Sequence, residues 1–205
     1  MNTFFSIENI AFSVLNSPIS VIELIGLGFS FVSVWQASRA NRLMWYTGLV
    51  GQLAYFALFY QIQLYSDMLL QVFFVLMQVQ GWIDWSRSSK ASDDKIVVRT
   101  FTPAHWLWVL VVQGLGTLAL GYTMHHFTDA AMPWPDAFAT VMSISAQWWM
   151  NKRFLQNWIL WIAVDFLYLF IYFAKGLYAT TVLYFVFLLM AVAGYLEWRR
   201  KVGET

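Results

Sequence analysis

Residues 155–174 read LQNWILWIAVDFLYLFIYFA, and Asp165 is the only charged side chain among them. A bilayer core of about 30 Å requires roughly 20 mostly apolar residues per helix, so this stretch predicts one membrane-spanning helix. Six other stretches have the same character. The predicted spans are residues 18–37, 43–61, 66–85, 103–123, 134–150, 155–174 and 177–197.

The composition of the whole chain agrees with that interpretation. Of the 205 residues, 60% are hydrophobic and 11% are charged, whereas soluble domains are about 45–50% apolar and about 25% charged. Backbone polar groups in lipid must be paired within the segment, so the spans are expected to be helices. We therefore predict an all-α membrane protein with seven transmembrane helices. The chain has no cysteine, which excludes disulfides and thiolate chemistry.

The N-terminal segment, residues 1–17, is too short to span a bilayer. Its apolar residues fall on one helical face, which predicts a short interfacial helix. An eighth span is the alternative. The apolar positions are Phe4, Ile7, Ile10, Ala11 and Val14.

Lysine and arginine are distributed unequally between the two sides of the seven spans. Eleven lie on one side, and only Lys175 lies on the other. Positive charges accumulate in cytoplasmic loops, so we predict an N-terminus outside and a C-terminus in the cytoplasm, in a bacterial inner membrane. Residues 86–102 are then a cytoplasmic loop and residues 199–205 a cytoplasmic tail.

An internal repeat appears when the chain is compared with itself without gaps, in the register that aligns Trp35 with Trp148. It predicts a first three-helix repeat over 18–85 and a second over 134–198. The helix at 103–123 is then a linker that gives both repeats the same orientation, a 3+1+3 plan seen in transporters. The other aromatic and glycine matches are Trp45 with Trp158, Tyr55 with Tyr168, Gly81 with Gly194, and Trp85 with Trp198.

Polar side chains within the spans are the candidate solute-binding residues, because polar groups at membrane depth tend to face a cavity or another helix. The alternative is that the amides and hydroxyls only hold helices together, and that Asp165 pairs with a neighbouring Tyr or Gln or is protonated. The candidates are Gln71 and Gln78 in the third span, Ser143 and Gln147 in the fifth, and Asn157, Trp158, Trp161, Asp165 and Tyr168 in the sixth.

These residue types suit a planar aromatic solute that carries hydroxyls and is either uncharged or cationic. No Lys or Arg lies within a span, which disfavours an anionic or phosphorylated solute. No paired catalytic set and no metal-ligand spacing is present, so we expect no enzyme activity, cofactor or metal. No nucleic-acid partner is expected.

Several motifs resemble those of the PnuC-type nicotinamide riboside transporters. They are QVFF at 71–74, GWIDW at 81–85, NWILW at 157–161, and Leu177-Tyr178 with Leu183-Tyr184 before Gly194 and Trp198. The resemblance covers residues 18–200. It implies a fold related to the SWEET sugar transporters, a homotrimer, and facilitated diffusion of nicotinamide riboside that is drawn forward by a cytoplasmic kinase.

The resemblance also implies roles for individual residues. Trp158 and Trp161 would flank the cationic ring of the solute. The side chains that would serve its polar groups are Asn157, Gln71, Gln147 and Asp165. Another aromatic vitamin, such as thiamine or riboflavin, is the alternative solute, and an intramembrane enzyme is the alternative class of protein.

Overall fold

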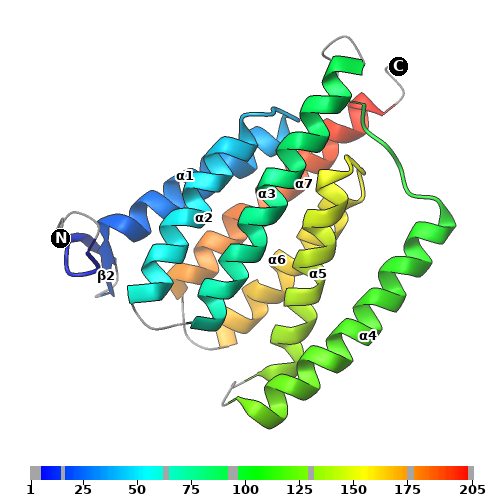
Figure 1. Cartoon of the computed structure of the whole chain (residues 1–205). Helices are drawn as coiled ribbons and strands as arrows, with labels where there is room; N and C mark the ends of the chain where they lie inside the picture. Colours follow the sequence, from blue (N-terminus) through cyan, green and yellow to red (C-terminus); the bar gives the residue numbers. More distant parts are fainter. Residues whose placement is uncertain are drawn as a thin grey trace. The chain divides into compact units, whose positions relative to one another are not determined.

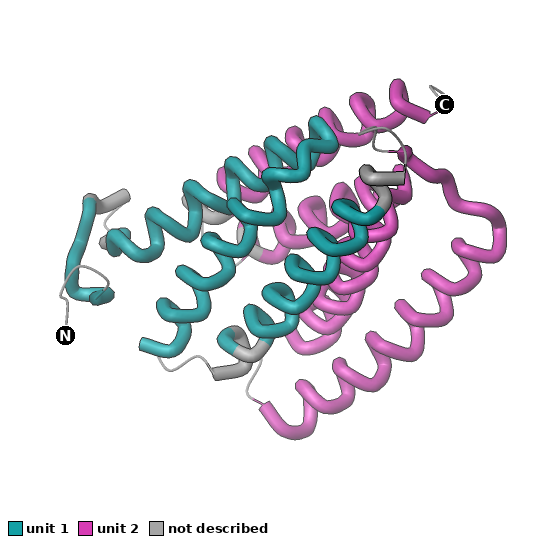
Figure 2. Tube along the Cα trace, turned by 45° about the horizontal axis from the view of Figure 1, so that its top comes forward, with its two compact units in different colours: residues 1–96 teal, residues 97–205 magenta. Residues whose placement is uncertain are grey.

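The computed structural model describes residues 6–14, 17–61, 65–91, 97–128, 132–174 and 178–202. The chain forms two compact units, residues 1–96 and 97–205, which are coloured separately in Figure 2. The division falls within the predicted cytoplasmic loop. The helix predicted as a linker therefore belongs to the second unit.

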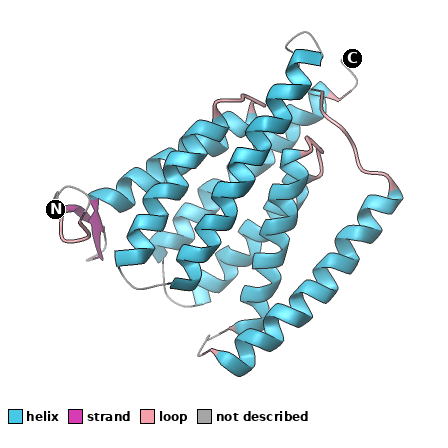
Figure 3. Cartoon of the chain, viewed as in Figure 1, coloured by secondary structure: helices cyan, strands magenta, loops and turns pink. Residues whose placement is uncertain are grey.

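Seven α-helices are present in the described parts of the chain (Figures 1 and 3), and each coincides with a predicted span. In the first unit, α1 packs on α2 and α2 on α3; in the second, α5 packs on both α4 and α6, and α6 packs on α7. The helices are α1 Val21–Ser38, α2 Met44–Gln61, α3 Tyr65–Ala91, α4 Pro103–Phe127, α5 Pro133–Asn151, α6 Asn157–Ala174 and α7 Tyr178–Lys201.

Within the part of the chain that the structure describes, three helical segments are long and apolar enough to cross a membrane on hydropathy alone: Val21–Ser38, Pro103–Phe127 and Thr181–Lys201. Other helices carry more polar residues along their length. In α5, the side chains of Ser143, Ser145 and Gln147 are all buried within the protein. Their polarity lowers the hydropathy of α5 without placing polar groups against lipid.

The N-terminal prediction is wrong over Ile10–Val14, which is a strand, β1, and not part of an interfacial helix. It pairs antiparallel with β2, Ser17–Ser20, so that Val14 lies opposite Ser17. Isoleucine, valine and phenylalanine favour strands. Residues 1–5 and 15–16, which the predicted helix also included, lie outside the described residues.

The first helix begins three residues later than predicted. Pro18 lies in β2, and α1 starts at Val21 after Ser20. The Ser20 hydroxyl accepts a hydrogen bond from the Glu23 backbone N–H at 3.3 Å, which satisfies one of the unpaired donors at a helix start.

Two segments that were predicted to be cytoplasmic are more helical than expected. The third helix continues to Ala91, past the predicted end at Trp85. The last helix continues to Lys201, where Glu197 lies 3.6 Å from the Lys201 amine. Polar, charged helix ends extend beyond the bilayer core, so hydropathy does not mark their boundaries.

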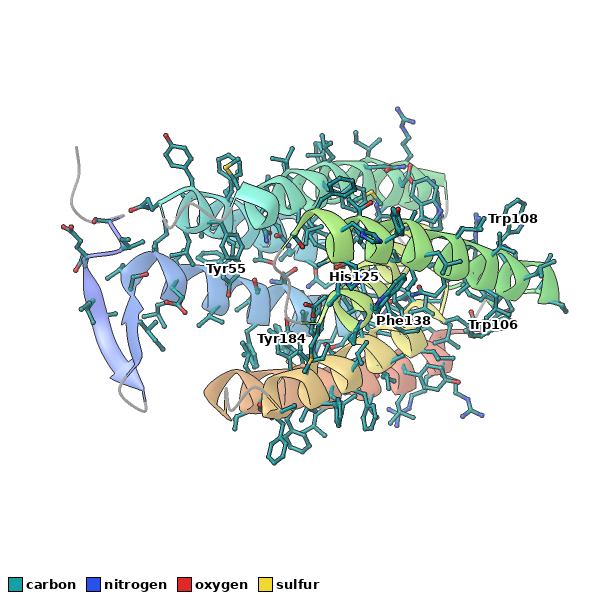
Figure 4. The ribbon with its side chains drawn as sticks, turned by 90° about the horizontal axis from the view of Figure 1, so that it is seen from below. Tyr55, Trp106, Trp108, His125, Phe138 and Tyr184 are labelled. Atoms are coloured by element: carbon teal, nitrogen blue, oxygen red, sulfur yellow. The ribbon has the colours of Figure 1, made fainter. Side chains whose placement is uncertain are left out.

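The fourth helix packs closely on α5. The Gln113 amide donates to the Phe138 carbonyl at 2.9 Å, and a side chain at Gly116 would lie 2.9 Å from Val141. The other face of α4 is apolar and exposed, and Figure 4 shows Trp108 pointing away from the helix. That face has the character expected of a lipid-facing surface.

Candidate functional site

The two turns that join α1 to α2 and α5 to α6 have the same backbone geometry. Ala40 has φ 56° and Arg153 has φ 60°, and they are the two non-glycine residues with positive φ in the described chain. These two residues are aligned with each other by the sequence repeat. Left-handed backbone is uncommon outside glycine, so its recurrence at aligned positions shows that the turn is repeated.

A cation lies over a tryptophan ring beside each of these turns. The Arg39 guanidinium is 4.5 Å from the centre of the Trp35 ring, and the Lys152 amine is 5.2 Å from that of Trp148. The repeat aligns both members of the first pair with those of the second. The cation is an arginine in the first unit and a lysine in the second. The placement of a cation over a tryptophan ring is therefore repeated although the basic side chain differs.

A tryptophan seated on a glycine is the third repeated feature. Trp45 meets Trp85 edge to face with ring centres 5.4 Å apart, and Trp158 meets Trp198 in the same way at 5.7 Å. A side chain at Gly81 would overlap the Trp45 ring. In the second unit, a side chain at Gly194 would lie 2.7 Å from the Trp158 ring.

This packing bears on the predicted role of Trp158. Its side chain is only 1% exposed, and Trp45, its counterpart in the first unit, is 2% exposed. Each ring fills the space between two neighbouring helices. That Trp158 also flanks a solute stays a prediction.

Trp161 has no equivalent in the first unit. The corresponding residue is Gly48, where the Gln78 amide of α3 occupies the space that a side chain would need. Trp161 is partly buried and packs against the buried cluster of Val109, Ala146 and Leu160. Its indole N–H is buried and has no hydrogen-bond partner among the described residues. Trp161 is thus an aromatic side chain of the second unit that the shared packing pattern does not require.

The polar candidates of α5 are hydrogen-bonded within that helix. The Ser143 hydroxyl donates to the Ala139 carbonyl at 2.9 Å, and the Gln147 amide donates to the Asn151 side-chain oxygen at 3.1 Å. Both side chains are buried.

Asn157 is fully buried at the start of α6, and its amide donates to the Phe154 carbonyl at 2.7 Å. Its side-chain oxygen has no partner among the described residues, so an acceptor is left for another group. Further along the helix, the Tyr168 ring lies 5.0 Å from that of Tyr184 on α7.

The structure brings the candidates of α5 and α6 to matching depths. The two helices are antiparallel neighbours, since a short turn joins them. Ser143 lies eight residues before the end of α5, and Asp165 lies eight residues after the start of α6. Gln147 and Trp161 each lie four residues from those same ends.

Gln71 and Gln78 lie on α3 in the first unit. Gln78 is buried and Gln71 is half-buried. The side-chain oxygens of both residues are buried without a partner among the described residues. Two acceptors spaced seven residues apart on a helix share one face, as the sequence predicted.

Sequence reasoning missed the polar groups of α1. The Ser33 hydroxyl donates to the Met44 carbonyl at 2.8 Å, and the Thr47 hydroxyl donates to the Gln36 side-chain oxygen at 2.7 Å. Ser33 and Gln36 are three positions apart and so share a helical face. The three-residue spacing of Ser33 and Gln36 could have indicated from the sequence alone that α1 has a polar face.

These features define a class of protein. Within each unit the helices bury amides, hydroxyls and tryptophans, and the predicted spans carry no Lys or Arg. The turns and the Trp–Gly packing of one unit recur in the other. The molecule is a multi-pass membrane transporter.

The sequence pattern of the nicotinamide mononucleotide transporter family matches residues 20–200. The chain belongs to this family.

Curated relatives of similar sequence agree with this family assignment. The chain is 28% identical to the nicotinamide riboside transporter PnuC of Escherichia coli (strain K12), over 98% of this chain and 96% of that one. It is also 28% identical to the transporter of the same name from Neisseria mucosa, over 89% and 72% of the two chains. The riboflavin/roseoflavin transporter RibM of Streptomyces davaonensis is 24% identical, over 92% and 89%.

The fold matches a solved structure. The crystal structure of the vitamin B3 transporter PnuC superposes with a TM-score of 0.71 at 22% sequence identity, and the match covers 88% of this chain and 81% of that one. At 22% sequence identity, this structural similarity supports the fold and not the function.

Proposed function

We propose that the protein carries nicotinamide riboside across the bacterial inner membrane by facilitated diffusion. The observation that carries the proposal is the lining of α6, where Trp161, Asp165 and the unpaired oxygen of Asn157 lie in a helix without a basic residue. A planar cationic ring with a ribose fits such a lining, because tryptophan faces attract cations and amides bond to hydroxyls.

The unphosphorylated solute fits better than the mononucleotide after which the family is named. A phosphate is bound in proteins by Arg, Lys or clustered backbone N–H groups. The predicted membrane spans contain no Lys or Arg. No basic side chain within the spans would therefore offset the negative charge of an entering phosphate group.

We assign the candidates to three roles. Trp161 offers its ring to the solute, and Trp158 supports it from within the helix packing. Polar groups of the solute are bonded by Asn157, Gln147, Gln71 and Asp165. The remaining lining is formed by Ser143, Gln78 and Tyr168.

The proposed architecture is the 3+1+3 plan, with α1–α3 and α5–α7 as parallel repeats and α4 between them. The repeated turns at Ala40 and Arg153 and the repeated Trp–Gly packing support it. The N-terminus lies outside and the C-terminus in the cytoplasm, as the distribution of lysine and arginine favours. The assembly is a homotrimer.

The driving force of uptake is consumption of the solute inside the cell. A uniporter only equalises the concentrations of free solute on its two sides. Phosphorylation by a cytoplasmic nicotinamide riboside kinase removes the free solute and keeps the inward gradient. The phosphorylated product does not fit the site and is retained.

The test is uptake into liposomes that contain the purified protein. Labelled nicotinamide riboside should enter until inside and outside concentrations are equal. It should accumulate beyond that level only when kinase and ATP are enclosed. Labelled nicotinamide mononucleotide should not enter. Protein-free liposomes that enclose kinase and ATP are the control. Accumulation against a gradient without kinase would contradict facilitated diffusion.

The second candidate solute is riboflavin, because a relative that covers most of the chain is named a riboflavin/roseoflavin transporter. Thiamine remains the other alternative. A ligand that binds only the folded protein raises its melting temperature. A shift with riboflavin or thiamine and none with nicotinamide riboside would overturn the leading assignment.

A further inference from the structure

Asp165 is an isolated carboxylate in the middle of α6. It lies eight residues after the start of the helix and nine before its end, and only 6% of its surface is exposed. Within the described ranges, its carboxylate has no hydrogen-bond or ion-pair partner. An acid at membrane depth is costly, and such acids mark solute or ion pathways.

An aromatic ring shares the helical face of this carboxylate. Trp161 lies four residues before Asp165, which places the two side chains one turn apart on the same side of α6. The indole N–H of Trp161 is buried and unpaired within the described residues. The Trp161 ring and the Asp165 carboxylate therefore lie on the same face of α6, where one solute could contact both.

The repeat shows that neither group belongs to the common packing of the two units. In the register of the repeat, Asp165 corresponds to Gln52 and Trp161 corresponds to Gly48. The structural tryptophan of the same helix, Trp158, does have its counterpart in Trp45. What the second unit alone carries at these two positions is the combination of a tryptophan ring and a carboxylate.

We propose that Asp165 selects the charge of the solute, its carboxylate acting as the counter-ion of a planar aromatic cation that lies against Trp161. The proposal rests on the proposed function and specifies the chemistry of that site. A cationic ring is attracted by both the carboxylate and the tryptophan face. A neutral ring of the same shape retains only the stacking contact.

The experiment compares two solutes that differ in ring charge. Nicotinamide riboside has a cationic ring; dihydronicotinamide riboside has the same ribose and carboxamide on an uncharged ring. Binding of both to the purified, detergent-solubilised full chain is measured by calorimetry. The wild type should bind the cation more tightly by about tenfold or more, the size of a close charge pair. Asp165→Asn should remove that preference by weakening only the binding of the cation.

Two matched variants complete the test. Asp165→Glu keeps the charge and should keep the preference for the cation, even if both affinities fall. Gln52→Asn alters the equivalent position of the first unit and should leave the preference unchanged. If Asp165→Asn does not fold, the wild-type preference and its persistence in Asp165→Glu decide the question.

Three results overturn the inference. Equal weakening of both solutes in Asp165→Asn would make the carboxylate a structural acceptor. Equal affinity of the wild type for the two solutes would remove charge selection altogether. If the wild type binds neither form but binds riboflavin, the proposed function fails and the inference fails with it.

Discussion

Trp158 and Trp161 are three positions apart on α6, yet their surroundings differ. Trp158 is sealed between Gly194 and Trp198, in a contact that Trp45 repeats in the first unit. Trp161 is partly buried and stands where the first unit has glycine. A residue that helix packing does not require is the better candidate for contact with a solute.

Replacement of Trp161 by Ala should weaken the binding of nicotinamide riboside by about 1–3 kcal/mol, the range for a base stacked on an aromatic side chain. That is roughly a five- to 150-fold rise in dissociation constant, to be measured by calorimetry on the purified protein. Trp148→Ala is the control, since Trp148 lies on α5 and its ring carries Lys152. Unchanged affinity in Trp161→Ala would remove this residue from the site.

At the scale of residues, the sequence revealed which positions correspond but not what they do. The repeat paired Trp45 with Trp158, and the structure shows both in the same packing role. The exchange of Gly48 and Gln78 for Trp161 and Ala191 could not be predicted from single positions. To predict this exchange, one would need to know that α2 and α3 approach closely. The Gln78 amide then fills the space beside Gly48 that a tryptophan ring would otherwise occupy.

Glycine is what allows neighbouring helices to approach within each unit. A β-carbon at Gly81 would overlap the Trp45 ring, and one at Gly194 would lie 2.7 Å from the Trp158 ring. Both rings are fully buried and cannot move aside into solvent. The two contacts hold α2 to α3 and α6 to α7.

Gly81→Ala and Gly194→Ala should each destabilise the protein by about 1–3 kcal/mol, because overpacked cores force side chains off their preferred geometry. The measurement is the thermal midpoint of loss of the monodisperse peak in size-exclusion chromatography. Gly28→Ala and Gly114→Ala are matched controls, since a β-carbon there meets nothing within 4 Å. Equal midpoints for all four variants would show that the close packing is unimportant.

The helices could be predicted from the sequence because each is a long apolar run, and such runs have one stable form in lipid. The β-hairpin could not. The segment Ile10–Val14 is short, and an apolar run of that length fits a strand or a helix turn. Ile10–Val14 becomes a strand because it pairs with Ser17–Ser20. Such pairing depends on both segments and cannot be predicted from the apolar pattern of one.

The segment before α4 is fixed to the α5–α6 turn. The Arg99 N–H donates to the Arg153 carbonyl and the Leu155 N–H to the Arg99 carbonyl, both at 2.8 Å. The Phe101 N–H donates to the Gln156 side-chain oxygen at 2.9 Å. These three bonds make the start of α4 part of the second unit.

Gln156→Leu should speed exchange of the Phe101 amide hydrogen, because it removes the acceptor of that bond. A net contribution of about 0.5–1.5 kcal/mol per hydrogen bond corresponds to roughly two- to tenfold faster exchange. Mass spectrometry of a peptide that begins near Val97 reports it. Gln156→Glu retains an acceptor oxygen and should exchange like the wild type; equal acceleration in both variants would count against the bond.

For the whole molecule, the number of membrane crossings decides whether the two repeats are parallel. An odd number places the termini on opposite sides, and three helices alone would invert the second repeat. In the proposed 3+1+3 plan, α4 adds a fourth crossing, so that α1 and α5 would cross the membrane in the same direction. The eleven-to-one distribution of Lys and Arg favours the same number of crossings.

The absence of cysteine makes this arrangement directly testable, because single cysteines can be introduced without background. A membrane-impermeant maleimide should label Glu8→Cys and Thr128→Cys in intact spheroplasts. It should label Arg99→Cys and Val202→Cys only after the membrane is opened, since positively charged segments are retained in the cytoplasm. Retained transport of nicotinamide riboside verifies that each variant is folded. Labelling of Glu8→Cys and Val202→Cys from the same side would require an even number of crossings, and parallel repeats joined by one helix would then be impossible.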